Sequence, residues 1–111
     1  MDFKIHVDNL AFSAIRKLKL EVNSVKDKIQ FNPYTLYRLE ERNISIDDVR
    51  ETILNGELIE YHYVNDERRI LLRNKEGTCV VLDVSRGRVI TVYKNDPDDN
   101  HKDLNRSNYL F

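Results

Sequence analysis

The sequence is poor in the residues that mark unusual classes of protein: its 111 residues include one cysteine, two prolines, three glycines and no tryptophan. The lone cysteine, Cys79, excludes an internal disulfide and any zinc site that takes several cysteines from one chain. Its place in the apolar run 78–84 favours a buried structural thiol over a nucleophile. With 41% hydrophobic and 33% charged residues, the composition is not that of a disordered or low-complexity chain. We therefore expect residues 1–111 to form a single domain.

The chain also lacks long apolar runs and the motifs of several enzyme classes. No run approaches the roughly 20 residues of a membrane-spanning helix, and residues 1–8 lack the apolar core of a signal peptide. No two histidines have metal-ligand spacing, and the acidic tail lacks the glycine and closing glutamate of a calcium loop. There is no glycine-rich phosphate loop and no serine nucleophile elbow. We expect a cytoplasmic protein without a metal or a cofactor.

Residues 1–27 are predicted to form an N-terminal helical extension. A short strand at residues 3–7 precedes Asp8 or Asn9, either of which can cap a helix. Apolar residues then follow at alternating steps of four and three, the period of one helix face. They are Ala11, Ile15, Leu18, Val22, Val25 and Ile29. The helix should run to about Lys26 and pack this stripe on the domain's own sheet, although a partner protein is an alternative cover.

Two short helices are predicted next, followed by a sheet. Pro33 suits the first turn of a helix over residues 34–42, and Asn43 tolerates the left-handed conformation at its end. Residues 45–48 resemble a capping box, and Gly56 ends the helix that they begin. Alternating strand patterns and intervening turns follow. The predicted strands are 28–31, 58–64, 68–73, 78–84 and 88–93. The prediction is an α+β fold with a twisted antiparallel sheet of four to five strands, whose one face the helices cover, and a polar tail at residues 95–111.

Charge is segregated along the chain although its formal net charge is only −1. Residues 34–67 carry three basic and nine acidic side chains, whereas residues 68–94 carry seven basic and two acidic ones. A sheet with such a basic face can attract phosphates. The alternative is that strands and helices merely complement each other's exposed charges.

The predicted strands also carry side chains suited to phosphate chemistry. Arg69 and Arg73 share a strand face because their spacing is even, and guanidinium groups bind phosphate oxygens in pairs. Arg88 and Tyr93 lie on the last strand. His62 points to the strand face opposite its two tyrosine neighbours, and imidazole suits proton transfer near neutral pH if that face is exposed.

A set of motifs resembles a known family of small bacterial proteins, the domain-of-unknown-function family 4258. Residues 34–45 read Tyr-Thr-Leu-Tyr-Arg-Leu-Glu-Glu-Arg-Asn-Ile-Ser, where the family typically reads His-Ala-x-x-Arg-x-x-x-Arg-x-Ile-Ser. The resemblance continues in an acidic helix start, a glycine-ended helix, a Glu-Tyr pair and a closing Thr-x-Tyr. These stand here as Asp47-Asp48-Val49, Gly56, Glu60-Tyr61 and Thr91-Val92-Tyr93. It covers about residues 28–94, and Tyr34 stands where the family has its leading histidine.

The resemblance implies a fold and a function. The family's β-α-α-β-β-β order, with one added strand, is similar to that of RelE-like and barnase-like ribonuclease toxins. It implies a metal-independent, RNA-cleaving protein of a toxin–antitoxin, phage or other mobile-element system, which acts on RNA or the ribosome and has a small cognate protein partner. Taken together with the basic sheet, the resemblance makes Arg38, Arg69, Arg73 and Arg88 the expected phosphate-binding residues. Proton transfer is expected from Tyr34, His62 or Tyr93.

Two hypotheses from other classes stand beside the enzyme. A non-catalytic protein-binding module, such as a phage or mobile-element inhibitor or an immunity-type partner, fits the near-neutral charge, the tyrosine at position 34 and the N-terminal apolar stripe. A structural subunit of an oligomer is the third. Arg38 and Arg42 would then form salt bridges that tie a helix to the sheet. At this point the residues leave open whether the protein is an enzyme, what RNA it cuts and how it oligomerises.

Overall fold

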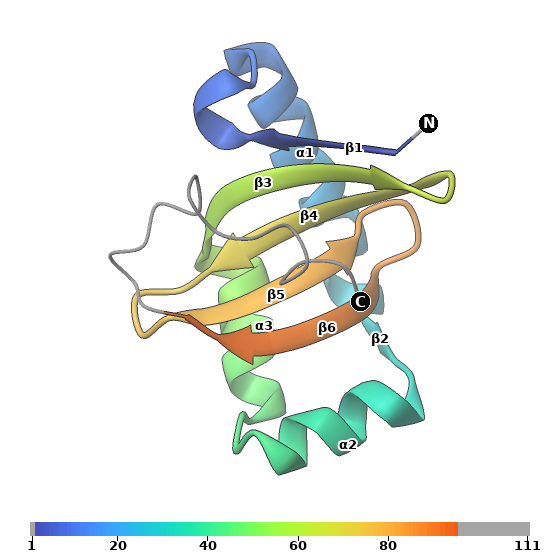
Figure 1. Ribbon diagram of the computed structural model, residues 1–111, viewed down its shortest axis with the longest axis vertical. Helices are drawn as coiled ribbons and strands as arrows, with labels where there is room; N and C mark the ends of the chain where they lie inside the picture. The colour runs from blue at the N-terminus through green and yellow to red at the C-terminus, as the bar shows by residue number, and fades with distance from the viewer. Residues whose placement is uncertain (1, 96–111) are drawn as a thin grey trace.

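The chain folds around a six-stranded sheet in the computed structural model, which describes residues 2–95 (Figure 1). The strands are β1 (Phe3–His6), β2 (Gln30–Phe31), β3 (Glu57–Val64), β4 (Glu67–Arg73), β5 (Thr78–Asp83) and β6 (Arg88–Lys94). The helices of the described residues are α1 (Phe12–Val25), α2 (Pro33–Glu41) and α3 (Ile46–Asn55), with 3-10 turns η1 (Val7–Asn9) and η2 (Lys26–Lys28). The predicted α+β class is confirmed. Apart from Asn95, the predicted polar tail lies outside the described residues.

The order of the strands differs from a simple meander. Across the sheet the order is β1-β3-β4-β5-β6-β2, and every neighbouring pair is antiparallel except β2 and β6, which are parallel. The prediction of an antiparallel sheet with four to five strands is therefore wrong in two respects. The sheet has six strands, and one of its strand pairs is parallel. The two additional pairings join β1 to β3 and β2 to β6, segments more than 50 residues apart in the chain. No local pattern encodes such distant pairings.

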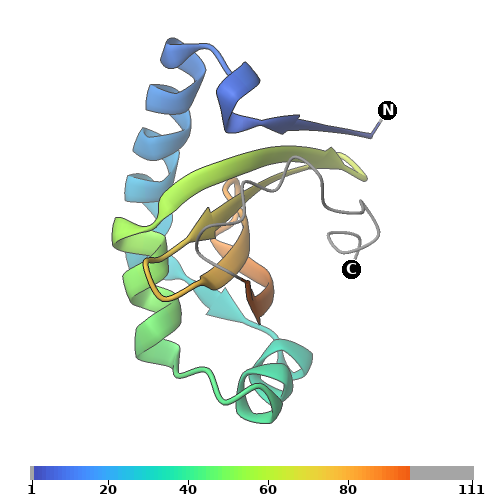
Figure 2. The same ribbon diagram turned by 60° about the vertical axis from the view of Figure 1, so that its left-hand side comes forward.

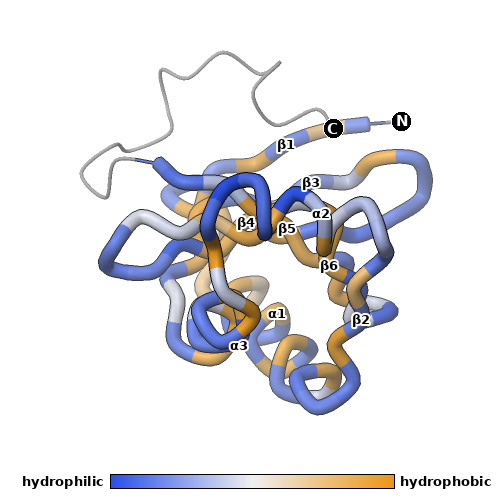
Figure 3. The backbone as a smooth tube through the Cα atoms, turned by 90° about the horizontal axis from the view of Figure 1, so that it is seen from below, coloured by the Kyte–Doolittle hydropathy of each residue, from blue (hydrophilic) through white to orange (hydrophobic). Residues whose placement is uncertain are grey.

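Helices α1 and α3 lie on one face of the sheet, and α2 lies beside β6 at one end (Figures 1 and 2). Alternate strand residues meet the helices in the main core. Its buried members are Leu18, Leu39, Ile44, Val49, Ile53, Leu58, Ile70, Leu72, Val80, Leu82, Val84, Val89 and Val92. In Figure 3, most of β5 and the apolar middle of β4 are accordingly orange, while the peripheral loops are largely blue. The expectation that the N-terminal helix packs on the domain's own sheet is confirmed.

Helix α1 begins later than predicted. Its N-cap is Ala11, without a side-chain cap, whereas Asp8 and Asn9 lie in the preceding turn η1. That turn has its own cap, because Nδ1 of His6 accepts a hydrogen bond from the backbone N–H of Asp8 at 3.1 Å. The capping residues are thus used to turn the chain after β1. No helix among residues 2–95 combines the length and the apolar character needed to cross a membrane.

The boundaries of α2 and α3 follow the predicted signals. Asn32 caps α2, since its Oδ1 accepts from the backbone N–H three residues on at 2.7 Å, and Asn43 takes the predicted left-handed conformation with φ of 55°. Ser45 caps α3 through the N–H of Asp48 at 3.0 Å. In a full capping box the Asp48 side chain would in turn accept from the backbone N–H of Ser45. Here the Asp48 carboxylate instead accepts from the Thr78 hydroxyl at 2.8 Å. Asp48 therefore anchors the start of α3 to β5.

Candidate functional site

A row of polar side chains runs straight across the sheet. The strand register pairs Lys4 with His62, His62 with Arg69, Arg69 with Asp83, and Asp83 with Arg88. Residues directly opposite each other on neighbouring strands point to the same face. Five strands therefore place these five side chains in one line, which we call the cross-sheet row.

The cross-sheet row lies on the face that α1 and α3 do not cover. Ile70 directly follows Arg69 in the chain, Leu82 directly precedes Asp83, and both belong to the core beneath the helices. Because successive side chains of a strand point to opposite faces, the row members point away from the helices. The same opposite face carries a second, smaller apolar cluster that includes Leu71, Cys79 and Val81, all 0% exposed. The prediction that Cys79 is a buried thiol is confirmed.

Two arginines of the row hold a single carboxylate between them. Nε and Nη2 of Arg69 donate to Oε2 of Glu67 at 2.9 and 2.6 Å, and Nη2 of Arg88 donates to the other oxygen, Oε1. Burial disfavours the charge on Glu67, but the hydrogen bonds and charges of both arginines outweigh it and hold the pKa of this carboxyl below its ordinary value. We call Arg69 and Arg88 the arginine fork.

The arginine fork has the chemistry of an oxyanion site. Carboxylate and phosphate oxygens accept guanidinium N–H groups in the same paired geometry, so a fork that grips one can grip the other. Nε of Arg88 is in addition buried and donates to no acceptor of the described residues. The fork therefore has donor capacity beyond its present ligand, and an anion with more oxygens than a carboxylate would use it.

His62 forms a buried pair with Glu60. The His62 Nε2 and Glu60 Oε1 atoms are 2.7 Å apart, and the two residues are 1% and 5% exposed. A register irregularity between Leu58 and Glu60 makes this possible, because strict alternation from Leu58 would turn Glu60 toward the helices. The predicted orientation of His62 is confirmed. The exposure that its catalytic role required is absent, since the ring is packed beneath its neighbours.

Arg73 and Tyr93 lie on the same face, farther along the strands. Both are paired with Cys79, so all three side chains project with the cross-sheet row. The predicted shared face of Arg69 and Arg73 is thereby confirmed. Arg73 is 8% exposed, and its Nη1 donates to Oδ1 of Asn95 at 3.2 Å.

The predicted helix residues Tyr34 and Arg38 lie elsewhere. Tyr34 is 61% exposed on α2, and Arg38 donates to its hydroxyl at 2.8 Å through Nε and to Glu41 at 2.7 Å through Nη1. These bonds raise the pKa of Arg38 and remain within the helix. Arg42 instead donates to the backbone carbonyl of Val92 on β6. Arg42 thus ties α2 to the sheet, but through a main-chain oxygen and not through the predicted salt bridge.

Sequence reasoning missed four of the residues that build the site: Lys4, Glu60, Glu67 and Asp83. A signal existed for two of them, because Glu60 and Glu67 each stand two residues before a predicted site residue on the same strand. Lys4 and Asp83 join the row only through long-range register. Within residues 2–95, no three His, Cys, Asp or Glu side chains gather as a group able to hold a metal ion.

Comparison with known proteins places the chain in a family. The family model described as "Domain of unknown function (DUF4258)" matches residues 36–102. This span is more than half of the chain, and the protein belongs to that family. No curated protein and no solved structure matches the sequence.

Proposed function

We propose that this member of the DUF4258 family is a metal-independent, RNA-cleaving protein of the RelE-like toxin type. The cross-sheet row is its proposed site of RNA cleavage. The observation that carries the proposal is the arginine fork, in which both oxygens of the partly buried Glu67 carboxylate are held by guanidinium groups. RNA offers the same oxyanion geometry at every phosphate. His62 lies in the same row as the fork and supplies a group for proton transfer.

The proposed reaction uses only side chains of this face. The 2′-oxygen of a ribose attacks the adjacent phosphorus, the bond from phosphorus to the 5′-oxygen breaks, and a 2′,3′-cyclic phosphate remains. The fork stabilises the charge that accumulates on the phosphate oxygens as the new bond forms. His62 moves the proton from the 2′-hydroxyl to the leaving 5′-oxygen, while Glu60 fixes the orientation of its ring. Arg73 and Tyr93 bind the neighbouring part of the RNA.

The arrangement requires RNA to replace internal partners. Glu67 occupies the fork and His62 is 1% exposed, so a phosphate must displace the carboxylate and the side chains above the ring before cleavage. The predicted role of Tyr34 and Arg38 is not included in this proposal. Their hydrogen bonds remain within α2, and neither belongs to the cross-sheet row.

The test is a cleavage assay with purified protein and single-stranded RNA in the presence of a metal chelator. The expected products end in a 2′,3′-cyclic phosphate, and a substrate with 2′-deoxyribose at the cleaved position remains intact because it lacks the attacking oxygen. His62→Asn should lower the rate at least about 100-fold, within the usual range for a general acid or base. Absence of cleavage by the unmodified protein, or equal cleavage of the deoxy substrate, would overturn the proposal.

A non-catalytic protein-binding module is the second candidate, and one observation favours it. The groups suited to chemistry are already paired with one another, His62 with Glu60 and the fork with Glu67. In such a module these pairs would serve only to stabilise the sheet. The same assay separates the two candidates, because a module binds a purified protein partner but releases no cyclic phosphate.

A further inference from the structure

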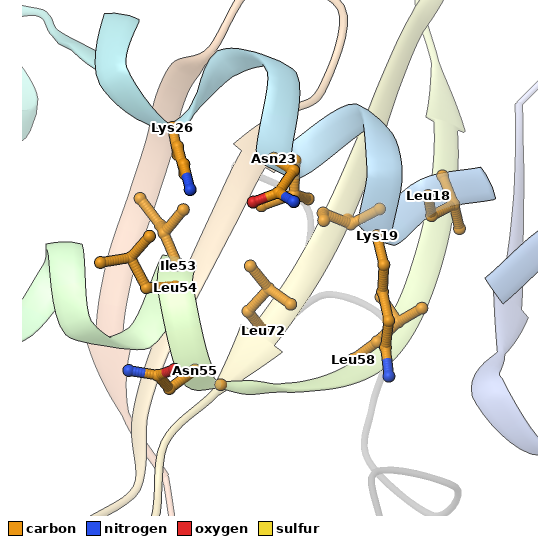
Figure 4. Close-up of a pocket in the computed structure, with 12 residues that line it drawn as sticks. Leu18, Lys19, Asn23, Lys26, Ile53, Leu54, Asn55, Leu58 and Leu72 are labelled. Carbon is orange, nitrogen blue, oxygen red and sulfur yellow. The ribbon is translucent and has the colours of Figure 1, made fainter. Parts of the chain in front are cut away.

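A cavity lies between α1 and α3, on the side of the sheet away from the cross-sheet row (Figure 4). Its volume is about 320 Å³, at the lower end of the roughly 300–1,000 Å³ of sites for small molecules. The floor is apolar and is formed by both helices and the sheet. Its residues are Leu18, Val22, Ile53, Leu58, Ile70 and Leu72. Such a floor stabilises a hydrocarbon group that leaves water.

The rim of the cavity carries positive charge from one face of α1 and the turn after it. Lys19, Asn23 and Lys26 follow each other at steps of four and three, so they share a helix face. In Figure 4, Asn23 and Lys26 point toward the space between the helices. Neither lysine takes part in any ion pair of the described residues. Two ammonium groups thus stand at the rim of the cavity without an ion-pair partner among residues 2–95.

We propose that this cavity binds an amphipathic carboxylate of the medium-chain fatty-acid type. The hydrocarbon chain would lie on the apolar floor, and the carboxylate would meet Lys19 or Lys26 and the amide of Asn23. Each part of the ligand matches one part of the site. An uncharged hydrocarbon would make no ionic contact with the lysines, and a small inorganic anion would make no contact with the apolar floor. The small volume favours a single acyl chain over a helix of a partner protein, which needs a long groove.

The proposed ligand site is independent of the proposed RNA site. The cavity residues face the helix side of the sheet, whereas the arginine fork and His62 project from the opposite side. Substitutions at Lys19 and Lys26 should therefore leave RNA cleavage unchanged. Failure of one proposal has no bearing on the other.

The experiment is a titration of the full chain with sodium decanoate, followed by NMR chemical shifts and calorimetry. Saturable shifts are expected at Leu18, Ile53 and Leu72. The variant Lys19→Gln/Lys26→Gln should raise Kd at least about tenfold, equivalent to about 1.4 kcal/mol. The matched control is Lys17→Gln/Lys28→Gln, which removes the same charge from α1 and η2 but does not line the cavity. Its Kd should stay within about twofold of the unmodified chain.

A second arm tests the role of charge in the ligand. Decanol has the same chain without the carboxylate and should bind at least about tenfold more weakly than decanoate. The proposal is overturned if decanoate fails to saturate, if its shifts fall outside the cavity, or if both double variants change Kd equally. Equal affinity for decanol would overturn it as well.

Discussion

Two regions of the molecule present arginines to different surroundings: the ladder of Tyr34, Arg38 and Arg42 on α2, and the cross-sheet row. The ladder is built by one short helix, and its members separate, with Arg38 bound to residues of its own helix and Arg42 bound to β6. The row is built by five strands, and its arginines converge on one carboxylate. Regular spacing in sequence therefore produced no shared site, whereas distant residues in register did.

The difference has a physical cause. A side chain on an exposed helix face meets mainly water and neighbours three or four positions away, so its charge is satisfied locally. A side chain in a sheet meets partners on both adjacent strands, and the sheet holds these partners at fixed separations. A site that must hold an anion rigidly is thus better built from strands than from the exposed face of a short helix.

The largest expected effect comes from removing the arginine fork. Arg69→Ala/Arg88→Ala should lower RNA cleavage at least about 100-fold, because two donors to the reacting phosphate are lost. The matched control, Arg38→Ala/Arg50→Ala, removes the same charge from exposed helix positions and should keep nearly full activity. Initial rates on one RNA substrate measure both. Equal losses in the two variants would show that only total charge matters.

The next largest effect concerns the buried pair of the row. Glu60→Ala leaves the His62 ring without its buried carboxylate and should lower the free energy of unfolding by about 1–3 kcal/mol. On the helix, Glu40→Ala changes an exposed residue and should alter it by no more than about 0.5 kcal/mol. Urea unfolding at neutral pH measures both. A Glu60→Ala protein as stable as the unmodified chain would contradict the assigned pair.

A smaller effect distinguishes the two arginines of the ladder. Arg42→Ala removes the hydrogen bond to the Val92 carbonyl at the sheet edge and should lower the free energy of unfolding by about 0.5–1.5 kcal/mol. Arg38→Ala removes only exposed contacts within α2 and should leave unfolding unchanged. The same urea experiment applies. The reverse ranking would mean that the ladder contributes to stability through Tyr34 and Glu41.

The smallest effect is the acid sensitivity of the fork. The pKa of Glu67 is lowered on folding, so its stabilising contribution is complete above the ordinary value of 4.5 and is lost as pH falls through the lower folded-state value. Glu67→Gln should therefore lose less stability than the unmodified chain between about pH 5 and pH 3. Arg38 likewise lowers the pKa of Glu41, but that pair is exposed and Glu41→Gln should flatten the profile less. Thermal unfolding of both variants across this pH range measures which substitution reduces the pH dependence of stability more.

Much of the fold was predictable because its signals are local. Pro33, Asn43 and Ser45 mark helix boundaries by their own backbone preferences, and the alternating strands beyond Gly56 show their period directly. The pairings of β1 and β2 were not predictable, because each is short and its partner lies far along the chain. The displaced start of α1 has a similar cause, since η1 uses Asp8 for a turn required by the position of β1.

The candidate site was predictable only in part. Even spacing placed Arg69 and Arg73 on one face, and alternation placed His62 opposite its tyrosine neighbours. The residues that these side chains contact depend on the register between strands and on the irregularity in β3, which turns Glu60 toward His62. Burial of His62 depends on packing of the whole face, which no period in the sequence reveals.

The most direct test of the cross-sheet row is NMR mapping of RNA on the isotope-labelled protein. A single-stranded RNA with 2′-deoxyribose throughout its cleavable positions binds without being cut. We expect saturable shifts of the side-chain signals of Arg69, Arg88 and His62, with those of Tyr34 and Arg38 unchanged. Shifts confined to the α2 ladder, with the arginine fork unaffected, would contradict the account.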